Sequence, residues 1–326
     1  LLRFFMTIKR RVIITGANGF VGSSLFDRVN KLDQYIVSGT VRSHSQQKNI
    51  FPIGNINSST DWSEVLRDQH IVIHTAARAH VMKDKSVDPL AEYRSVNVGA
   101  SLKLAEQAAK AGVKRFIFIS SIKANGEGRE DKHAYSYNDM LAPEDEYGVS
   151  KAEAEVGLKK IATKTGMEMV IIRPTLIYGP GVKGNFSLLM RLASRGLPLP
   201  LGAIHNYRSM VALENLIDLI VTSIDHPRAA NETFLVSDDQ DVSTTELLHK
   251  MAYAFGKKAK LIPIPMSWLI GGATLFGKKA MVDRLCGSLQ VDITHTKETL
   301  GWKPPVTMEQ QLAKIVASMQ LSSQDV

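Results

Sequence analysis

The hydrophobic positions in the first half of the chain form short apolar runs separated by stretches with helical spacing. These runs cover residues 11–15, 35–41, 71–74, 116–120 and 170–173. The clearest helical stretch between them is 98–111, where apolar side chains recur along one face of a helix. Continuous apolar strands that alternate with helices are typical of a parallel sheet covered on both faces. We therefore predict a doubly wound α/β fold.

The pattern changes after about residue 175. Glycine and proline become frequent, and helical patterns near 188–194, 213–224 and 244–255 replace the alternation. We predict a Rossmann-type domain over 6–175 and a smaller, mostly helical substrate-binding cap over 176–326, with some elements of the second part returning to the first. Met6 is a candidate translation start, because the first strand follows it closely.

Three glycines follow the first apolar run in a Gly-x-x-Gly-x-x-Gly spacing. They are Gly16, Gly19 and Gly22, and their neighbours in the loop are Asn18, Phe20 and Val21. The first glycine permits a tight turn, the second lets the backbone approach a pyrophosphate, and the third lets the helix pack against the strand. The N–H groups at the start of the helix attract the anion. The loop therefore predicts a dinucleotide-binding site.

The residue after the second strand bears on the choice of cofactor. An acid there would hydrogen-bond the ribose 2′-hydroxyl, whereas an arginine accommodates a 2′-phosphate. Here the strand ends at Val41 and Arg42 follows it. We expect NAD or NADP, with Arg42 favouring NADP because a guanidinium pairs with phosphate through two hydrogen bonds.

Tyr147 and Lys151 stand four positions apart, which places them on one face of a helix. A phenol of ordinary pKa is a poor base at neutral pH, and a neighbouring ammonium favours the phenolate. Tyr147 is therefore a candidate general acid and base. The fourth apolar run ends in Ser120 and Ser121, whose hydroxyls at the carboxyl edge of the sheet can bond a reacting oxygen.

With His74-Thr75-Ala76-Ala77 and Asn97, these motifs resemble the extended short-chain dehydrogenase/reductase family. Within it the chain is similar to the NAD-dependent epimerase/dehydratase group, especially its UDP-glucose 4-epimerase-like members. The resemblance implies that Ser121, Tyr147 and Lys151 are catalytic. The expected cofactor contacts are Gly16, Asn18, Gly19, Phe20, Val21, Gly22, Arg42, Asn55, Ile56, Ala76, Ala77, Asn97, Ser120, Tyr147, Lys151 and Pro174. The expected substrate contacts are Ser121, Asn185, Arg208 and Arg284.

The resemblance implies hydride transfer at C4 of a UDP-hexose or UDP-hexosamine, and two reactions stay open. Whole-chain similarity favours a 4-epimerase that keeps its cofactor. Arg42, and Leu176 where 4-epimerases often have asparagine, favour a one-way NADPH-dependent reductase of a UDP-4-keto-6-deoxy-hexosamine. We lean to the 4-epimerase. A 4,6-dehydratase is disfavoured, because Ile122-Lys123 stands where that group has an Asp-Glu pair.

The composition excludes several classes of partner and site. The net charge is +8, but no dense basic run with interleaved aromatics is present, so we expect no nucleic-acid partner. The single cysteine, Cys286, excludes a disulfide framework and a cysteine zinc site, fits a cytoplasmic location, and leaves no metal expected. A homodimer is one expected assembly, since extended family members often dimerise.

The most apolar stretch, residues 261–276, is shorter than the ~20 residues of a membrane-spanning helix. We expect a core helix or a surface-lying helix there. Two weaker alternatives remain for the whole chain: an enzyme acting on a lipid-linked sugar, with peripheral membrane contact, and a non-catalytic dinucleotide sensor.

Overall fold

The computed structural model describes residues 9–79, 86–128, 133–275, 282 and 285–321. Two residues singled out from the sequence, Met6 and Arg284, lie outside these ranges.

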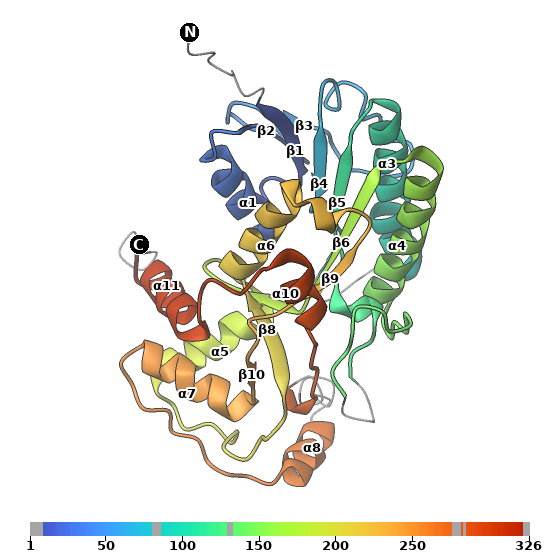
Figure 1. The fold of residues 1–326 in the computed structure, drawn as a ribbon. Coiled ribbons are helices and arrows are strands. Elements are labelled where there is room, and N and C mark those ends of the chain that lie inside the picture. The colour runs from blue at the N-terminus through green and yellow to red at the C-terminus, as the bar shows by residue number, and fades with distance from the viewer. Residues whose placement is uncertain (1–8, 80–85, 129–132, 276–281, 283–284, 322–326) are drawn as a thin grey trace.

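A seven-stranded sheet forms the centre of the fold (Figure 1). In spatial order its strands are β3 (Ile50–Pro52), β2 (Tyr35–Val41), β1 (Arg10–Thr15), β4 (Ile71–His74), β5 (Arg115–Ile119), β6 (Glu168–Pro174) and β9 (Thr233–Val236). Every neighbouring pair is parallel. This confirms the predicted doubly wound α/β fold. Each of the five apolar runs coincides with a strand, although the fourth run extends one residue past the end of β5, to Ser120.

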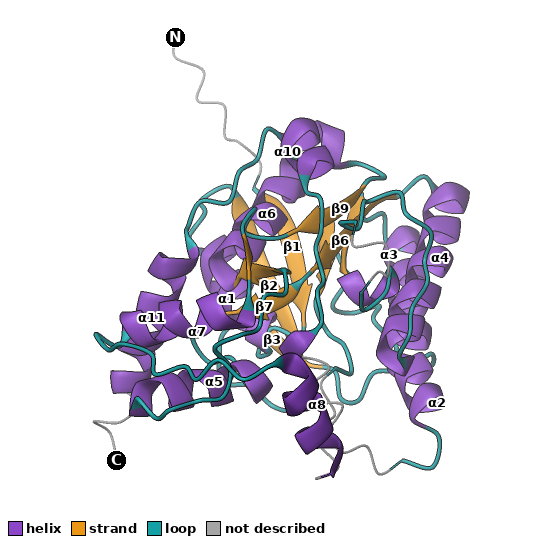
Figure 2. Cartoon of the chain, turned by 90° about the horizontal axis from the view of Figure 1, so that it is seen from below, coloured by secondary structure: helices purple, strands orange, loops and turns teal. Residues whose placement is uncertain are grey.

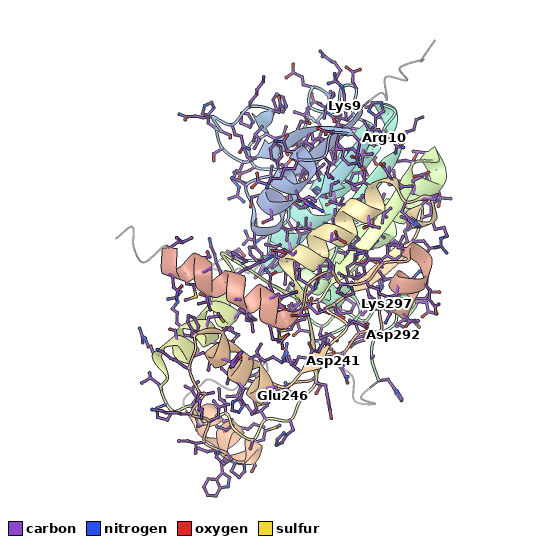
Figure 3. All side chains as sticks on the ribbon, turned by 60° about the vertical axis from the view of Figure 1, so that its left-hand side comes forward. Lys9, Arg10, Asp241, Glu246, Asp292 and Lys297 are labelled. Carbon is purple, nitrogen blue, oxygen red and sulfur yellow. The ribbon has the colours of Figure 1, made fainter. Side chains whose placement is uncertain are left out.

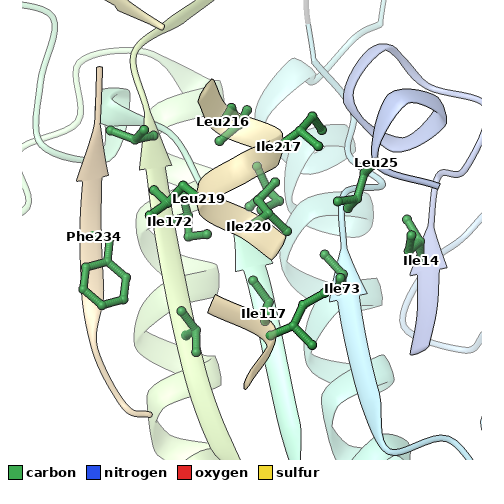
Figure 4. Packing of buried hydrophobic residues seen from close by; sticks show 14 of the residues in the cluster. Ile14, Leu25, Ile73, Ile117, Ile172, Leu216, Ile217, Leu219, Ile220 and Phe234 are labelled. Atoms are coloured by element: carbon green, nitrogen blue, oxygen red, sulfur yellow. The ribbon is translucent and has the colours of Figure 1, made fainter. Parts of the chain in front are cut away.

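Helices cover both faces of the sheet. On one side lie α1 (Phe20–Asn30) and α6 (Leu213–Asp225), and on the other α2 (Pro89–Tyr93), α3 (Ser101–Lys110) and α4 (Glu146–Thr165). Successive strand residues point to opposite faces, so Ile14 packs in the α1–α6 layer with Leu25 while Ile13 packs in the other layer. Figure 4 shows the first layer closely packed. Because both faces of the sheet are buried, the strands appear in the sequence as uninterrupted apolar runs.

The cap has its own hydrophobic cluster, which joins α5 (Gly184–Arg195), α7 (Thr244–Ala254) and α11 (Met308–Leu321). A three-stranded sheet lies beside it, in the order β10 (Asp241–Val242), β8 (Arg208–Ala212) and β7 (Leu176–Tyr178). A capping box between Ser243 and Glu246 begins α7. Two elements from beyond residue 175, β9 and α6, belong to the central sheet and its covering layer, and α10 (Thr294–Leu300) packs near β9.

The direction of the strands places the carboxyl edge of the sheet toward the cap. Figure 3 shows Lys9 and Arg10, at the start of β1, at the end of the sheet opposite the cap. Arg10 is held there by an ion pair of 2.5 Å with Asp225 at the end of α6. The loops that follow the carboxyl ends of β1, β4, β5 and β6 therefore lie between the sheet and the cap.

The apolar stretch 261–276 contains α8 (Met266–Leu275), which lies at the end of the cap remote from the central sheet (Figures 1 and 2). Trp268 on this helix is 75% exposed, so the helix is surface-lying. Within the described ranges, no helix has the length and apolar character needed to cross a bilayer.

Candidate active site

The order of the strands reverses at the carboxyl ends of β1 and β4. The chain passes from β1 to β2 and β3 on one side, whereas β4, β5 and β6 extend the sheet on the other. Ligands of doubly wound sheets bind where the strand order reverses in this way. The glycine loop leaves β1 at this point, and Thr75, Ala76 and Ala77 leave β4 beside it.

The glycine loop is shaped by close approaches that exclude a side chain. Gly16 has a φ of +69°, in the left-handed region, and a Cβ at Gly22 would lie 2.1 Å from the carbonyl oxygen of Gly16. Helix α1 therefore starts directly against the turn. Its N-cap, Gly19, offers no side-chain hydrogen bond, and the first turn carries no acidic residue. Backbone N–H groups in this setting fit a pyrophosphate.

The neighbours of the glycines lie around this turn. Asn18 is exposed, whereas Phe20 and Val21 are partly buried at the start of α1. A Cβ on Gly16 would contact the backbone of Ala76 at 3.0 Å, which shows how closely the two loops approach. Ala77, like Ala76, is partly exposed.

A buried histidine joins the two loops to the sheet. His74 Nδ1 lies 2.6 Å from Thr15 Oγ1, and its Nε2 lies 2.8 Å from Ser101 Oγ on α3. Thr15 Oγ1 also accepts a hydrogen bond from the Ala76 N–H at 3.2 Å. Burial, with the nearby charge of Lys151, lowers the pKa of His74 to about 3, so the ring is neutral at neutral pH. Its role is to position the loops.

Ser121, Tyr147 and Lys151 meet at the carboxyl edge beyond β5. Ser121 begins the short 3₁₀ helix η2 (Ile122–Ala124), and Tyr147 lies in the first turn of α4. The Ser121 hydroxyl lies close enough to the phenol to lower the pKa of Tyr147. The Lys151 ammonium donates to the carbonyl oxygen of Ile119 at 2.8 Å and lies 5.9 Å from the centre of the Tyr147 ring. The geometry brings the three expected catalytic residues together.

The pKa values of this group are set mainly by burial. Burial, reinforced by the carboxylate of Asp145, raises the pKa of Tyr147 above its ordinary value, and the nearby Ser121 hydroxyl opposes this. Burial lowers the pKa of Lys151 to about 7, and the charge of Glu155 opposes this shift. The sequence-based expectation that the ammonium favours the phenolate is therefore outweighed by burial in the protein alone.

Sequence reasoning missed a buried ion pair directly beneath these residues. Glu155 and Arg173 have side chains only 1% and 3% exposed, and Arg173 Nη2 lies 2.6 Å from Glu155 Oε2. The Ser120 hydroxyl donates to Glu155 at 2.5 Å, and Arg173 also donates to Asn125 Oδ1 at 3.0 Å. The only sequence signal was the position of Glu155, four residues after Lys151 on the same helix.

This pair affects two residues expected to contact the cofactor. The hydroxyl of Ser120 is directed at Glu155, and Ser120 is 2% exposed. Pro174 is buried at the end of β6, directly after Arg173. Both therefore lie in the wall of the site, at the ends of neighbouring strands.

A second missed cluster surrounds Lys123. Its ammonium lies 2.5 Å from Asp145 and 2.6 Å from Glu127. Asp145 is also the N-cap of α4, accepting from the Gly148 N–H at 2.7 Å. A Cβ on Gly148 would lie 2.5 Å from the Lys123 carbonyl oxygen, so α4 starts directly against η2. These contacts fix Tyr147 relative to Ser121.

Asn97 lies in the π-helical segment η1 (Arg94–Ala100) and is 1% exposed. Its side-chain amide donates to the Arg78 carbonyl oxygen at 3.0 Å and to Ser150 Oγ at 2.9 Å, and its oxygen accepts from the Arg78 N–H. Asn97 thus ties the loop after β4 to the helix that carries Tyr147.

The residues expected at the adenosine end lie at the opposite side of the glycine loop. Arg42 is exposed directly after β2, and its carbonyl oxygen accepts from the Gly54 N–H at 3.1 Å. Asn55 follows and is exposed, whereas Ile56 packs against the core cluster of α3 and α4. Arg42 and Asn55 are therefore close neighbours at the ends of adjacent strands.

The cap supplies the residues expected to hold the substrate. Arg208 begins β8, and its guanidinium donates to the Gly287 carbonyl oxygen at 3.2 Å. Burial lowers the pKa of Arg208, and the charge of Glu127 opposes this. Because Glu127 also contacts Lys123, Arg208 lies on the side of the cap that faces the Ser121 turn. Asn185 is the second residue of α5 and is partly exposed.

We find no candidate metal-binding site among the residues that the structure describes. No group of three or more His, Cys, Asp and Glu side chains there could hold a metal ion.

Comparison with known proteins identifies the relatives of this chain. Residues 12–237 match the model of the NAD dependent epimerase/dehydratase family. A UDP-glucose 4-epimerase of Vibrio cholerae is 52% identical over 305 residues, which cover 92% of this chain and 93% of the relative. An N-acetyl-alpha-D-glucosaminyl-diphospho-ditrans,octacis-undecaprenol 4-epimerase of Escherichia coli O157:H7 is 28% identical, with 92% of each chain covered.

The fold is also found among solved structures. A UDP-glucose 4-epimerase of Thermotoga maritima, solved with UDP-glucose, superposes with a TM-score of 0.76 at 22% identity. The superposition covers 96% of this chain and 99% of that one. The likeness extends through both the central sheet and the cap.

Proposed function

This chain belongs to the NAD-dependent epimerase/dehydratase family, and on that premise we propose that it is a UDP-sugar 4-epimerase. The observation that carries the proposal is the convergence of Ser121, Tyr147 and Lys151 beside a glycine loop, in a chain so similar over its whole length to a UDP-glucose 4-epimerase. A sensor that only bound a dinucleotide would not need this acid–base group.

The site fits NAD(P). A Cβ at Gly22 would lie 2.1 Å from the Gly16 carbonyl oxygen, and those at Gly16 and Gly19 would be crowded at 3.0 and 3.1 Å. The uncapped start of α1 supplies N–H groups for the pyrophosphate. Ala76 and Ala77 would line the dinucleotide, and Lys151 would hold the nicotinamide ribose. When bound, the nicotinamide supplies the acceptor and donor of hydride at the sugar C4.

Residues of the chain transfer the proton of the sugar 4-hydroxyl. Tyr147 accepts the proton of the sugar 4-hydroxyl as the C4–H bond breaks, and returns it when the keto sugar has turned and is reduced on its other face. Ser121 hydrogen-bonds the same oxygen. Burial raises the pKa of Tyr147, so the phenol starts as an acid, and a positive charge beside it is needed before it can serve as a base.

We assign the substrate diphosphate to Arg208, because the cap has no glycine loop and a guanidinium pairs well with phosphate. The carboxylate of Glu127, which pairs with Lys123, interacts with the charge of this arginine, so the diphosphate would replace it as the anion facing the guanidinium. Asn185, at the start of α5, is assigned to the uridine.

The test is turnover of UDP-glucose and UDP-N-acetylglucosamine by the purified protein, with product sugars separated by chromatography. The epimerase proposal predicts interconversion of the C4 epimers without consumption of added NADPH. A UDP-4-keto-6-deoxy-hexosamine with NADPH serves as the competing substrate. Stoichiometric loss of NADPH absorbance with that sugar alone would instead establish the one-way reductase. Tyr147→Phe is the matched inactive control.

A second form of the substrate has one observation in its favour. The relative in E. coli O157:H7, similar over nearly the whole chain, bears the name of a 4-epimerase of a sugar carried on a lipid diphosphate. Arg208 would meet a diphosphate in either substrate. The assay therefore includes N-acetylglucosamine on a polyprenyl diphosphate beside its UDP counterpart.

A further inference from the structure

One part of the cap has an unusual distribution of charge. Residues 247–282 contain six lysines and no aspartate or glutamate, although the chain as a whole carries 32 acidic residues. The same stretch contains α8, whose sequence MSWLIGGATL has no charged side chain and is the most apolar of the helices that the structure describes. Basic and apolar residues that occur together without acids are typical of segments that meet an anionic membrane surface.

The apolar side chains of this stretch are open to solvent. Trp268 is 75% exposed, Ile262 50% and Met266 37%, and Tyr253 at the end of α7 is 79% exposed. Two prolines, Pro263 and Pro265, precede the helix and keep its approach extended. Ile262, Met266 and Trp268 are exposed together in one short segment, and large apolar residues that gather at a surface mark an interaction site.

The basic side chains lie in the loop that joins α7 to α8. Lys257, Lys258 and Lys260 are all exposed, and Lys257 also donates to the carbonyl oxygen of Ser194. The loop runs along the end of the cap remote from the central sheet, and α8 follows it there (Figure 1). We call Tyr253, Lys257, Lys258, Lys260, Ile262, Met266 and Trp268 the docking surface.

We propose that this docking surface binds the face of an anionic lipid bilayer. The side chains of Ile262, Met266 and Trp268 enter the interfacial region, while the three lysines contact the phosphates of the headgroups. The ten residues of α8 fit a helix lying in the interface rather than one crossing it. An aromatic ring with an apolar body and a polar edge is the side chain best suited to that depth.

Charge argues against a second copy of the chain as the occupant. In a two-fold contact the same surface meets itself, so the lysines of one copy would face those of the other. Residues 247–282 hold no acid, and Glu309, which lies beside Lys257 and Lys258, is already paired with Lys250. An anionic bilayer has the opposite charge and imposes no shape on the apolar helix. This inference does not rest on the proposed function.

The three tryptophans make a direct optical test available. Trp62 and Trp302 are 1% and 4% exposed, so Trp268 is the indole that a bilayer can reach. With the full chain, we expect flotation with vesicles of phosphatidylcholine and phosphatidylglycerol, together with a blue shift of tryptophan emission. Neither should occur with phosphatidylcholine alone, and salt should weaken both because it screens exposed charges.

Variants locate the contact. Lys257→Glu/Lys258→Glu should lower the partition coefficient onto anionic vesicles by about tenfold or more, since each lysine near the surface contributes about a factor of five. The matched control is Lys159→Glu/Lys160→Glu, a pair of exposed lysines on α4. Trp268→Ser should lose binding, whereas Val156→Ser, which changes a 45% exposed residue on α4, should keep it.

Three outcomes would overturn the proposal. The first is no flotation of the wild-type chain, and the second is an equal loss of vesicle binding in Lys159→Glu/Lys160→Glu. The third is a dimer that depends on Trp268 and whose tryptophan emission does not change when vesicles are added. The unfolding temperature, measured in each variant, verifies folding and should be unchanged, so a failure of docking is separate from a failure of the proposed function.

Discussion

The buried pair of Glu155 and Arg173 gives the sharpest test of how the site is held together. Glu155→Gln removes the only charge that faces the guanidinium in that contact while keeping an oxygen for the Ser120 hydroxyl. Because both side chains are almost fully buried, loss of one partner leaves an uncompensated charge that costs about 3–5 kcal/mol. For a chain of 326 residues, that cost lowers the unfolding temperature by about 4–7 °C.

The same substitution should change the titration of the site. The negative charge of Glu155 raises the pKa of Lys151, which burial lowers to about 7. Without that charge the pKa falls further, so Lys151 loses its proton at lower pH. We expect the basic limb of the pH–rate profile to move to lower pH in Glu155→Gln, measured as kcat/KM across neutral pH.

A double variant separates charge from packing. Glu155→Leu/Arg173→Met removes both charges and keeps apolar volume, so it should recover most of the stability lost in Glu155→Gln. Chemical denaturation of the single and double variants completes the comparison. A loss of stability under about 1 kcal/mol in Glu155→Gln would refute the reasoning. So would a double variant that loses as much stability as Glu155→Leu and Arg173→Met lose when their separate costs are added.

Four further predictions concern catalysis and binding. Tyr147→Phe should lower turnover by ~10²–10⁴ and leave cofactor affinity nearly unchanged by calorimetry; wild-type turnover would exclude Tyr147 as the acid–base group. Gly22→Ala should abolish cofactor binding, because its Cβ would lie 2.1 Å from a carbonyl oxygen, whereas Gly271→Ala, with open space around it, should bind normally. Arg42→Ala should weaken NADP binding about tenfold more than NAD binding, and equal losses would make Arg42 a plain surface residue. Arg208→Ala should raise KM with little change in kcat; an unchanged KM beside weakened cofactor binding would show the assignment to be wrong.

The sequence predicts those parts of the fold whose signal is local. Strands β1, β2, β4, β5 and β6 are visible because burial on both faces makes them continuous apolar runs. The glycine loop and the spacing of Tyr147 and Lys151 are equally local, since each lies on one turn or one helix. Strand β3 is only 3 residues long and two of them are exposed, so it carries no hydrophobic pattern to detect.

The unpredicted parts depend on contacts between distant segments. Glu155 and Arg173 are 18 residues apart and come from a helix and a strand, so only the packing of α4 on β6 shows that they pair. The direction of the Tyr147 pKa shift follows from burial, which the Tyr-x-x-x-Lys spacing does not contain. The cluster of Lys123, Asp145 and Glu127 likewise joins two segments 22 residues apart.

The return of β9 to the central sheet has a consequence for how the chain folds as it is synthesised. Strand β6 ends at Pro174, but its outer neighbour is not made until Val236, after α5, β8 and α6 have been translated. During that interval the nascent polypeptide presents an unpaired strand edge, the kind of surface that templates intermolecular pairing. The first 175 residues expressed alone would keep this edge permanently open and lack the apolar cover of α6. Such a fragment should aggregate, and completion of the sheet on the ribosome must wait for the middle of the chain.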